Sequence, residues 1–244
     1  MKKHIPNIIT LLNLTSGVSG IVSAMNGHWE LAFWLMIAGA IFDFFDGMVA
    51  RLLKVSGPLG AELDSLSDMV TFGVLPSIMM YKMMLVSPTP ITSFEIMDVR
   101  VFPMIAFVIA AMSGLRLAKF NIDDRQTTSF IGLPTPANAL LIGALSLATY
   151  SICDCEPFHQ FISNAYFLAG LSLVLSYILV AELPLFALKF KNLSWTDNKI
   201  RYIFILSSIA LLAIFYKWMY MAILIIIPLY VFMSVFNNAF GKKK

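Results

Sequence analysis

The sequence predicts an all-α fold, a polytopic bundle of transmembrane helices that forms a single domain over residues 1–244. Of the 244 residues, 59% are hydrophobic and only 13% are charged, whereas a soluble domain is about half apolar and about a quarter charged. The mean hydropathy is +0.82, and the apolar residues come in blocks of about 20, enough for a helix to cross a bilayer. No segment is long and polar enough for a separate soluble domain. No basic patch interleaved with aromatic residues suggests nucleic acid as a partner.

Eight apolar blocks are expected to span the membrane, at residues 6–25, 29–53, 61–85, 101–120, 133–152, 162–181, 201–216 and 218–238. The first block is interrupted by Asn7, Thr10 and Asn13, and a polar stripe on a membrane helix normally faces the bundle. We therefore interpret it as a span rather than as a signal peptide. Only the segment from Tyr216 to Trp218 separates the last two blocks, so they are expected to form a helical hairpin. If that pair were one kinked helix, the number of spans would be seven.

The lysines and arginines predict the orientation of the bundle. With an even number of spans, most of them fall on one side, namely Lys2, Lys3, Arg51, Lys54, Lys119, Arg125, Lys189, Lys191, Lys199, Arg201 and Lys242 to Lys244. Only Lys82, Arg100 and Lys217 fall on the other side or near its boundary. By the positive-inside rule, both termini are expected in the cytoplasm, and the protein is expected in the cell membrane.

Two cysteines, Cys153 and Cys155, lie in the loop after the fifth block. A spacing of one residue is poor for a metal site and strained for a disulfide. Two unpaired thiols and a disulfide both stay open as interpretations.

A charged stretch of the form D-x2-D-G-x2-A-R-x8-G-x3-D-x3-D interrupts the apolar sequence between Asp43 and Asp68. It covers the end of the second block and the start of the third, so it is expected at the cytoplasmic boundary. Asp43 and Asp46 are three residues apart, and Asp64 and Asp68 are four apart, so each pair shares one face of its helix. Two facing helices would therefore bring four carboxylates together.

Four carboxylates cannot all stay ionised in one dry pocket without a counter-charge. Divalent cations with oxygen ligands supply that charge, and Mg²⁺ or Mn²⁺ commonly bridges carboxylates to substrate phosphates. Two such ions about 4 Å apart would polarise a phosphoryl group. Gly47 and Gly60 would let a ligand approach the backbone, and Arg51 would hold a phosphate. Any single one of these residues could instead be an ordinary interfacial charge or a helix cap, but the complete pattern indicates a site.

This pattern resembles the signature of the CDP-alcohol phosphotransferase family. The resemblance implies a six-helix transmembrane core, to which residues 201–238 would be an addition, and a homodimer. It implies that two divalent cations, Mg²⁺ or Mn²⁺, are held by Asp43, Asp46, Asp64 and Asp68, and that Asp68 is also the general base on the incoming hydroxyl. It implies contacts to the CDP moiety from Gly47, Ala50, Arg51 and Gly60.

Four further stretches, at residues 6–17, 63–76, 116–121 and 130–137, resemble the bacterial and archaeal phosphatidylserine synthases of that family. This resemblance implies transfer of a phosphatidyl group from CDP-diacylglycerol to L-serine, with release of CMP. Serine carries a carboxylate that needs a cation, and Arg116 and Arg125 are the available ones. Asn121 and Thr135 could hydrogen-bond the acceptor. Each has a simpler interpretation, as a snorkelling side chain for Arg116, a solvated loop pair with the neighbouring aspartates for Arg125, and a helix cap for Asn121 and Thr135.

Two other functions stay open at this point. The first is the same chemistry with another acceptor, glycerol-3-phosphate or an inositol phosphate, which should need more clustered cations than Arg116 and Arg125 supply. The second is a divalent-cation transporter. A transporter would be expected to place its carboxylates near the membrane midplane on broken helices, and an arginine such as Arg51 is unfavourable in a cation path.

Overall fold

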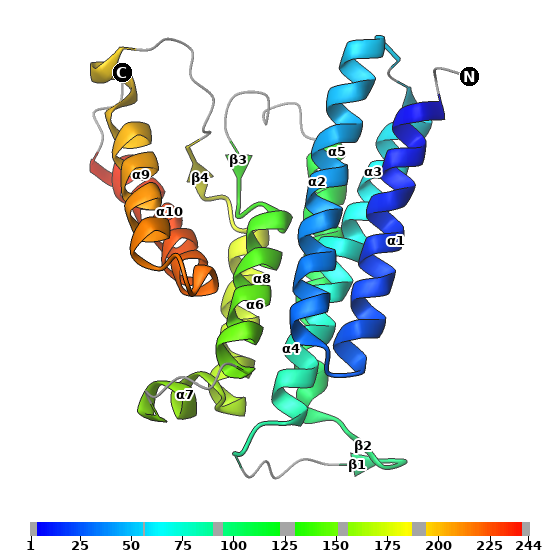
Figure 1. Cartoon of the computed structure of the whole chain (residues 1–244), viewed down its shortest axis with the longest axis vertical. Coiled ribbons are helices and arrows are strands. Elements are labelled where there is room, and N and C mark those ends of the chain that lie inside the picture. The colour runs from blue at the N-terminus through cyan, green and yellow to red at the C-terminus, as the bar shows by residue number, and fades with distance from the viewer. Residues whose placement is uncertain are drawn as a thin grey trace.

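The computed structural model describes residues 4–55, 57–89, 95–122, 130–150, 156–186 and 194–240. Almost all of these residues are helical, and the long helices run up and down a common bundle (Figure 1). The predicted all-α class is therefore confirmed. Two short two-stranded ribbons are the exceptions, β1 (Glu95–Ile96) with β2 (Val99–Arg100) and β3 (Phe130–Ile131) with β4 (Pro184–Leu185).

The first half of the chain forms a three-helix layer. Helix α1 (Ile5–Met25) turns at Gly27, which has a φ of +80° that suits glycine, and packs along its whole length on α2 (Trp29–Leu53). The chain then returns in one continuous rod made of α3 (Pro58–Asp68), the π-helix η2 (Met69–Val74) and α4 (Leu75–Leu85). Pro58 opens α3 at a first-turn position, where its missing N–H costs nothing.

The second half adds the 3₁₀ turn η3 (Phe102–Ala106), α5 (Phe107–Ile122), α6 (Thr135–Tyr150), the short α7 (Glu156–Ile162) and α8 (Ala165–Val180). Helix α5 packs on α8 and on η2, and α6 packs on α2 and α4. Helices α5 and α6 thus both contact η2, the segment that directly follows α3 (Figure 1).

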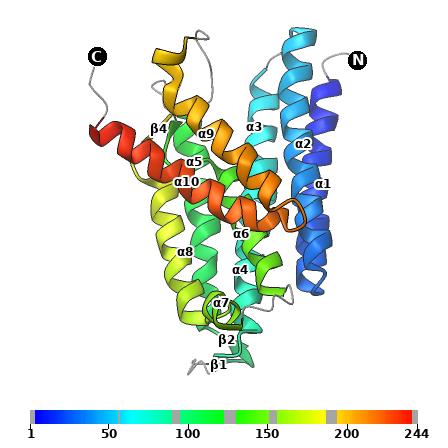
Figure 2. The same cartoon turned by 60° about the vertical axis from the view of Figure 1, so that its left-hand side comes forward.

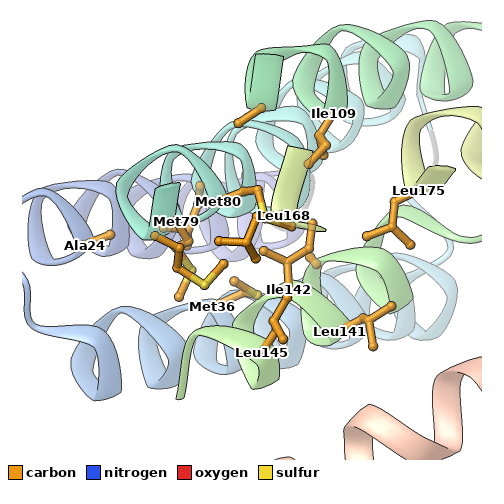
Figure 3. Packing of buried hydrophobic residues seen from close by; sticks show 14 of the residues in the cluster. Ala24, Met36, Met79, Met80, Ile109, Leu141, Ile142, Leu145, Leu168 and Leu175 are labelled. Carbon is orange, nitrogen blue, oxygen red and sulfur yellow. The ribbon is translucent and has the colours of Figure 1, made fainter. Parts of the chain in front are cut away.

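The hydrophobic core lies between α2, α4, α6 and α8 and is rich in methionine. Met36 on α2 and Met79 and Met80 on α4 are fully buried, and they meet Ile142 and Leu145 of α6 (Figure 3). Methionine is unbranched and adapts to irregular gaps between helices. This core fixes α2, α4 and α6 relative to one another.

Helices α9 (Trp195–Ile214) and α10 (Met219–Phe240) form the expected hairpin, so the alternative of one kinked helix is wrong. The pair lies obliquely across the bundle, and its turn lies about midway along the bundle, away from the end that carries β1 and β2 (Figures 1 and 2). Helix α10 packs on α6 and β4.

A helix overlaps each of the eight expected blocks, although the bounds differ by up to six residues, and the number of membrane spans is not confirmed. Within the described part of the chain, four segments are long and apolar enough to cross a bilayer, 5–25, 29–53, 102–122 and 219–238. Helices α6 and α8 have 16 residues each and therefore rise about 24 Å, less than the hydrocarbon thickness of about 30 Å. The eight-span count stays a prediction.

Candidate active site

Three of the four predicted aspartates converge in the upper half of the bundle. Asp43 comes from α2, and Asp64 and Asp68 come from successive turns of α3. One carboxylate oxygen of each lies within 4.8 Å of the others, and all three side chains are half-buried. Oxygen atoms this close can bind one cation together.

Asp46 lies one turn beyond Asp43 on α2 and is not part of this group of three. It is buried, and its Oδ2 accepts a hydrogen bond of 2.6 Å from the hydroxyl of Thr10 on α1. It is still near enough to Asp43 and Asp64 for electrostatic interaction with both. The four carboxylates therefore form a cluster of three with one neighbour that α1 holds.

Helix α1 also holds the group of three. Nδ2 of Asn13 donates a hydrogen bond to Oδ1 of Asp68 at 3.1 Å. The other carboxylate oxygen of Asp68, Oδ2, is not bonded to this amide. The backbone carbonyl of Asn13 in turn accepts from the hydroxyl of Thr71 in η2 at 3.0 Å. These two bonds link Asn13 of α1 to Asp68 at the end of α3 and to Thr71 in η2.

Two glycines allow this close approach. A side chain at Gly17 of α1 would collide with Thr71, and one at Gly39 of α2 would collide with both Thr71 and Asn13. Small residues let membrane helices come close enough for polar contacts between them. The junction of Gly17, Gly39 and Thr71 thus sets the spacing of α1, α2 and η2 directly below the aspartates.

The π-helix η2 begins at the residue after Asp68. Its i→i+5 bonding accommodates an extra residue and shifts the faces of α4 relative to those of α3, and such segments recur at functional sites. The shift lets Asp64 and Asp68 face α2 while Met79 and Met80 below still face the core.

A cavity of about 570 Å³ opens beside the aspartates, between the upper ends of α1, α2 and α3. It is lined by His4, Pro6, Asn7, Thr10, Asp46, Gly47, Ala50, Lys54, Val55, Gly57, Leu59, Gly60, Ala61 and Asp64. Three of the four residues expected at the CDP moiety, Gly47, Ala50 and Gly60, are among them. The fourth, Arg51, is exposed, and its Nη1 lies close over Gly47.

Of the residues expected at the acceptor, two are brought together beside Asp68. Arg116 of α5 is buried, and its Nη1 lies 3.5 Å from the hydroxyl of Thr135 at the start of α6. Arg116 also interacts electrostatically with Asp68. Asn121 instead donates to Ser65 of α3 at 2.9 Å and is exposed. Arg125, like Cys153 and Cys155, lies outside the described residues.

A known protein family matches the part of the chain that contains this site. The family described as CDP-alcohol phosphatidyltransferase matches residues 3–181. The chain belongs to the CDP-alcohol phosphatidyltransferase family. The match ends one residue after α8, so the hairpin of α9 and α10 lies beyond it.

Curated relatives of this phosphatidyltransferase agree with the family match. The chain is 35% identical over 148 residues to CDP-diacylglycerol–serine O-phosphatidyltransferase of Bacillus subtilis, covering 61% of this chain and 77% of the relative. It is 35% identical over 139 residues to the protein of the same name in Helicobacter pylori, covering 56% and 54%. It is 32% identical over 149 residues to archaetidylserine synthase of Methanothermobacter thermautotrophicus, covering 60% and 59%. The chain thus spans between about half and three quarters of the length of these relatives.

The donor set fits the divalent cation that this family of enzymes implies. Asp43, Asp64 and Asp68 offer only carboxylate oxygens, the ligand type that Mg²⁺ and Mn²⁺ prefer. Oδ1 of Asp64 is buried and has no hydrogen-bond partner among the described residues. A buried carboxylate oxygen without a donor is costly unless a cation satisfies it.

Sequence reasoning did not assign Thr10 and Asn13 to the site. Their spacing of three residues placed both on the inward face of the first helix, which the polar stripe did predict. Their partners, Asp46 and Asp68, lie 36 and 55 residues away. No local pattern connects a stripe to a particular carboxylate, so only the packed structure could identify these pairs.

Proposed function

We propose that this enzyme transfers the phosphatidyl group of CDP-diacylglycerol to the hydroxyl of L-serine and releases CMP. The observation that carries the proposal is that Asp68 belongs to the carboxylate cluster and also interacts electrostatically with the buried Arg116. The first supports phosphoryl transfer, and the second supports an acceptor that carries one carboxylate. The names of the relatives agree with this choice.

The donor substrate would occupy the cavity between α1, α2 and α3. Gly47, Ala50 and Gly60 line it without bulky side chains, so the cytidine and the diphosphate can approach the backbone. Arg51 lies at Gly47 and would bind a phosphate oxygen. The acyl chains would extend into the bilayer.

The carboxylates would hold two divalent cations, Mg²⁺ or Mn²⁺, with Asp43, Asp64 and Asp68 as the central ligands and Asp46 beside them. When bound, the cations supply positive charge at the phosphate oxygens, where negative charge accumulates during transfer. Thr10 and Asn13 fix the carboxylates that receive them. Holding the ligands in place in advance lowers the cost of reorganisation.

The reaction itself would be a single displacement. Asp68 accepts the proton of the serine hydroxyl, and the serine oxygen attacks the phosphorus attached to diacylglycerol. The bond from that phosphorus to the bridging oxygen breaks, and CMP leaves with the bonding electrons. Arg116 and Thr135 orient the serine by its carboxylate, with Asn121 and Arg125 as further acceptor-side candidates.

We further propose eight spans, both termini in the cytoplasm, an active site at the cytoplasmic face of the cell membrane, and a homodimer. The cavity lies between the first turns of α1, the last turns of α2 and the first turns of α3. It is therefore at the end of the bundle where α1 begins (Figure 1). Among the described residues predicted to be cytoplasmic, Lys54 follows the last residue of α2 and Lys119 lies in the last turn of α5, at the ends of these helices that point the same way as the N-terminal end of α1. A soluble acceptor and a lipid-linked nucleotide can both reach a site there.

The alternative acceptors fit less well. Glycerol-3-phosphate or an inositol phosphate brings a dianionic phosphate, and beside Asp68 the described residues offer one buried cation, Arg116. A divalent-cation transporter is not retained, because the family is one of enzymes.

An acceptor panel tests the proposal. The purified protein would be incubated with CDP-diacylglycerol and Mn²⁺, and CMP release would be followed with L-serine, glycerol-3-phosphate, myo-inositol phosphate or no acceptor. Serine should give the fastest release, with phosphatidylserine as product. Release with a phosphorylated acceptor but not with serine would overturn the choice of acceptor and leave the phosphotransferase chemistry intact.

A further inference from the structure

Unpartnered polar atoms lie within one helical turn of the contact between Arg116 and Thr135, on both of the helices that make it. Nε of Arg116, Oγ of Ser113 and both amide atoms of Asn138 are buried and have no hydrogen-bond partner among the described residues. Ser113 lies one turn before Arg116 on α5, and Asn138 lies one turn after Thr135 on α6. The proposed mechanism above gives no role to Ser113 or Asn138.

The burial of these groups makes their lack of partners significant. Asn138 and Ser113 are both 0% exposed. Buried polar groups in folded proteins are nearly always hydrogen-bonded, and an apolar side chain of similar size would avoid the cost. An asparagine with neither its donor nor its acceptor satisfied therefore indicates a binding partner that the described residues do not supply.

The chemistry of these groups defines that ligand. An amide offers an acceptor and two donors on one rigid plane, and a guanidinium offers only donors. Together they match a small molecule that has a cationic N–H group and a carboxylate on adjacent atoms, as an α-amino acid has. A phosphate would leave the amide oxygen of Asn138 without a donor.

We propose that Asn138 and Ser113 bind the amino-acid part of the acceptor and determine its specificity. This inference rests on the proposed function. Oδ1 of Asn138 and Oγ of Ser113 accept from the α-ammonium group, while Nδ2 of Asn138 and Arg116 donate to the α-carboxylate. The serine hydroxyl is then directed toward Asp68, which interacts electrostatically with Arg116.

The substitution Asn138→Leu tests this inference, because it keeps the volume and removes both polar groups. The KM for serine should rise at least tenfold, while the KM for CDP-diacylglycerol at saturating serine stays within twofold of wild type. The preference for serine over 3-hydroxypropionate, which lacks the amino group, should fall by about tenfold. In wild type, serine should raise the melting temperature of the detergent-solubilised protein, and in the variant this shift should be lost.

A matched pair of serines provides the control. Ser113→Ala and Ser163→Ala each remove one buried, unpartnered hydroxyl, but Ser163 lies at the turn between α7 and α8, at the opposite end of the bundle (Figure 1). Only Ser113→Ala should raise the KM for serine. Asn138→Ala serves as a second variant if Asn138→Leu fails to fold, with the same expected change.

The possible failures are distinguishable. Wild-type protein that releases no CMP with serine overturns the proposed function. An active wild type whose KM for serine is unchanged in a folded Asn138 variant, or is changed equally by Ser113→Ala and Ser163→Ala, overturns only this assignment.

Discussion

The hydroxyl of Thr10 donates a 2.6 Å hydrogen bond to the carboxylate of Asp46, from one long helix to the next. One turn further along α1, Asn13 makes the corresponding bond to Asp68 on α3. Helix α1 contributes no carboxylate of its own, yet it contacts the acidic residues of both other helices. Its polar stripe therefore acts as the frame that holds the acidic cluster in place.

Replacing Thr10 by valine should test this frame. The substitution keeps the shape and removes the donor to a charged group, a bond that contributes about 1.5–3 kcal/mol. We expect serine-dependent CMP release to fall about tenfold and the Mn²⁺ titration to shift to higher concentration. Thr15→Val is the matched control, because Thr15 is exposed on the same helix and, among the described residues, its hydroxyl bonds only to the carbonyls of Leu11 and Leu12 in that helix. Equal effects of the two variants would contradict a specific role for Thr10.

Asp68→Asn should keep the fold and lose turnover. The amide is nearly isosteric but cannot accept the proton of the serine hydroxyl, and a general base contributes about 10²- to 10⁴-fold to a rate. CMP release should be measured at saturating Mn²⁺ and serine, with thermal unfolding as the check on folding. Serine-dependent release at the wild-type rate would remove Asp68 from the role of base.

Asp43→Asn separates metal binding from base catalysis. Asp43 is the contribution of α2 to the group of three carboxylates, and its replacement removes one charged ligand. The concentration of Mn²⁺ or Mg²⁺ needed for half-maximal activity should rise about tenfold or more. Asp98→Asn, in the ribbon of β1 and β2 at the other end of the bundle, should change nothing. An unchanged titration for Asp43→Asn would exclude it as a ligand.

Gly39→Ala should destabilise the protein and lower activity together. The added methyl group would lie 2.6 Å from Cγ2 of Thr71 and 2.9 Å from Oδ1 of Asn13, so the helices must separate, at a cost of about 1–3 kcal/mol. Gly170→Ala is the control, since a methyl group there meets nothing within 4 Å. A lower melting temperature is expected for Gly39→Ala alone. A Gly39→Ala protein as stable and active as Gly170→Ala would contradict the close three-helix junction.

The sequence predicted the parts of the site that depend on helical spacing. The intervals within the acidic stretch placed Asp43, Asp64 and Asp68 on facing helix surfaces, and the structure brings them together. It did not predict the π-helix after Asp68, because no residue type in Met69–Val74 distinguishes a π-helix from an α-helix. The proposed role of Asn138 was not predicted for another reason. A lone amide in an apolar block has no partner to recognise until tertiary packing shows that its partners are absent.

The C-terminal hairpin offers a last prediction, because it contacts the segment that leads into the proposed acceptor side of the site. The hydroxyl of Tyr230 on α10 donates to the carbonyl of Phe186 at 2.9 Å, and both rings pack with Phe204 of α9. Phe186 follows β4, which pairs with β3, and β3 continues through Gly132 to Thr135.

Tyr230→Phe removes one hydrogen bond, which contributes about 1 kcal/mol, and should loosen this connection. We expect the KM for serine to rise about two- to fivefold with the KM for CDP-diacylglycerol unchanged, whereas Tyr216→Phe, at an exposed ring in the turn between α9 and α10, should change neither. Equal changes in both KM values for Tyr230→Phe would instead indicate a general loss of stability.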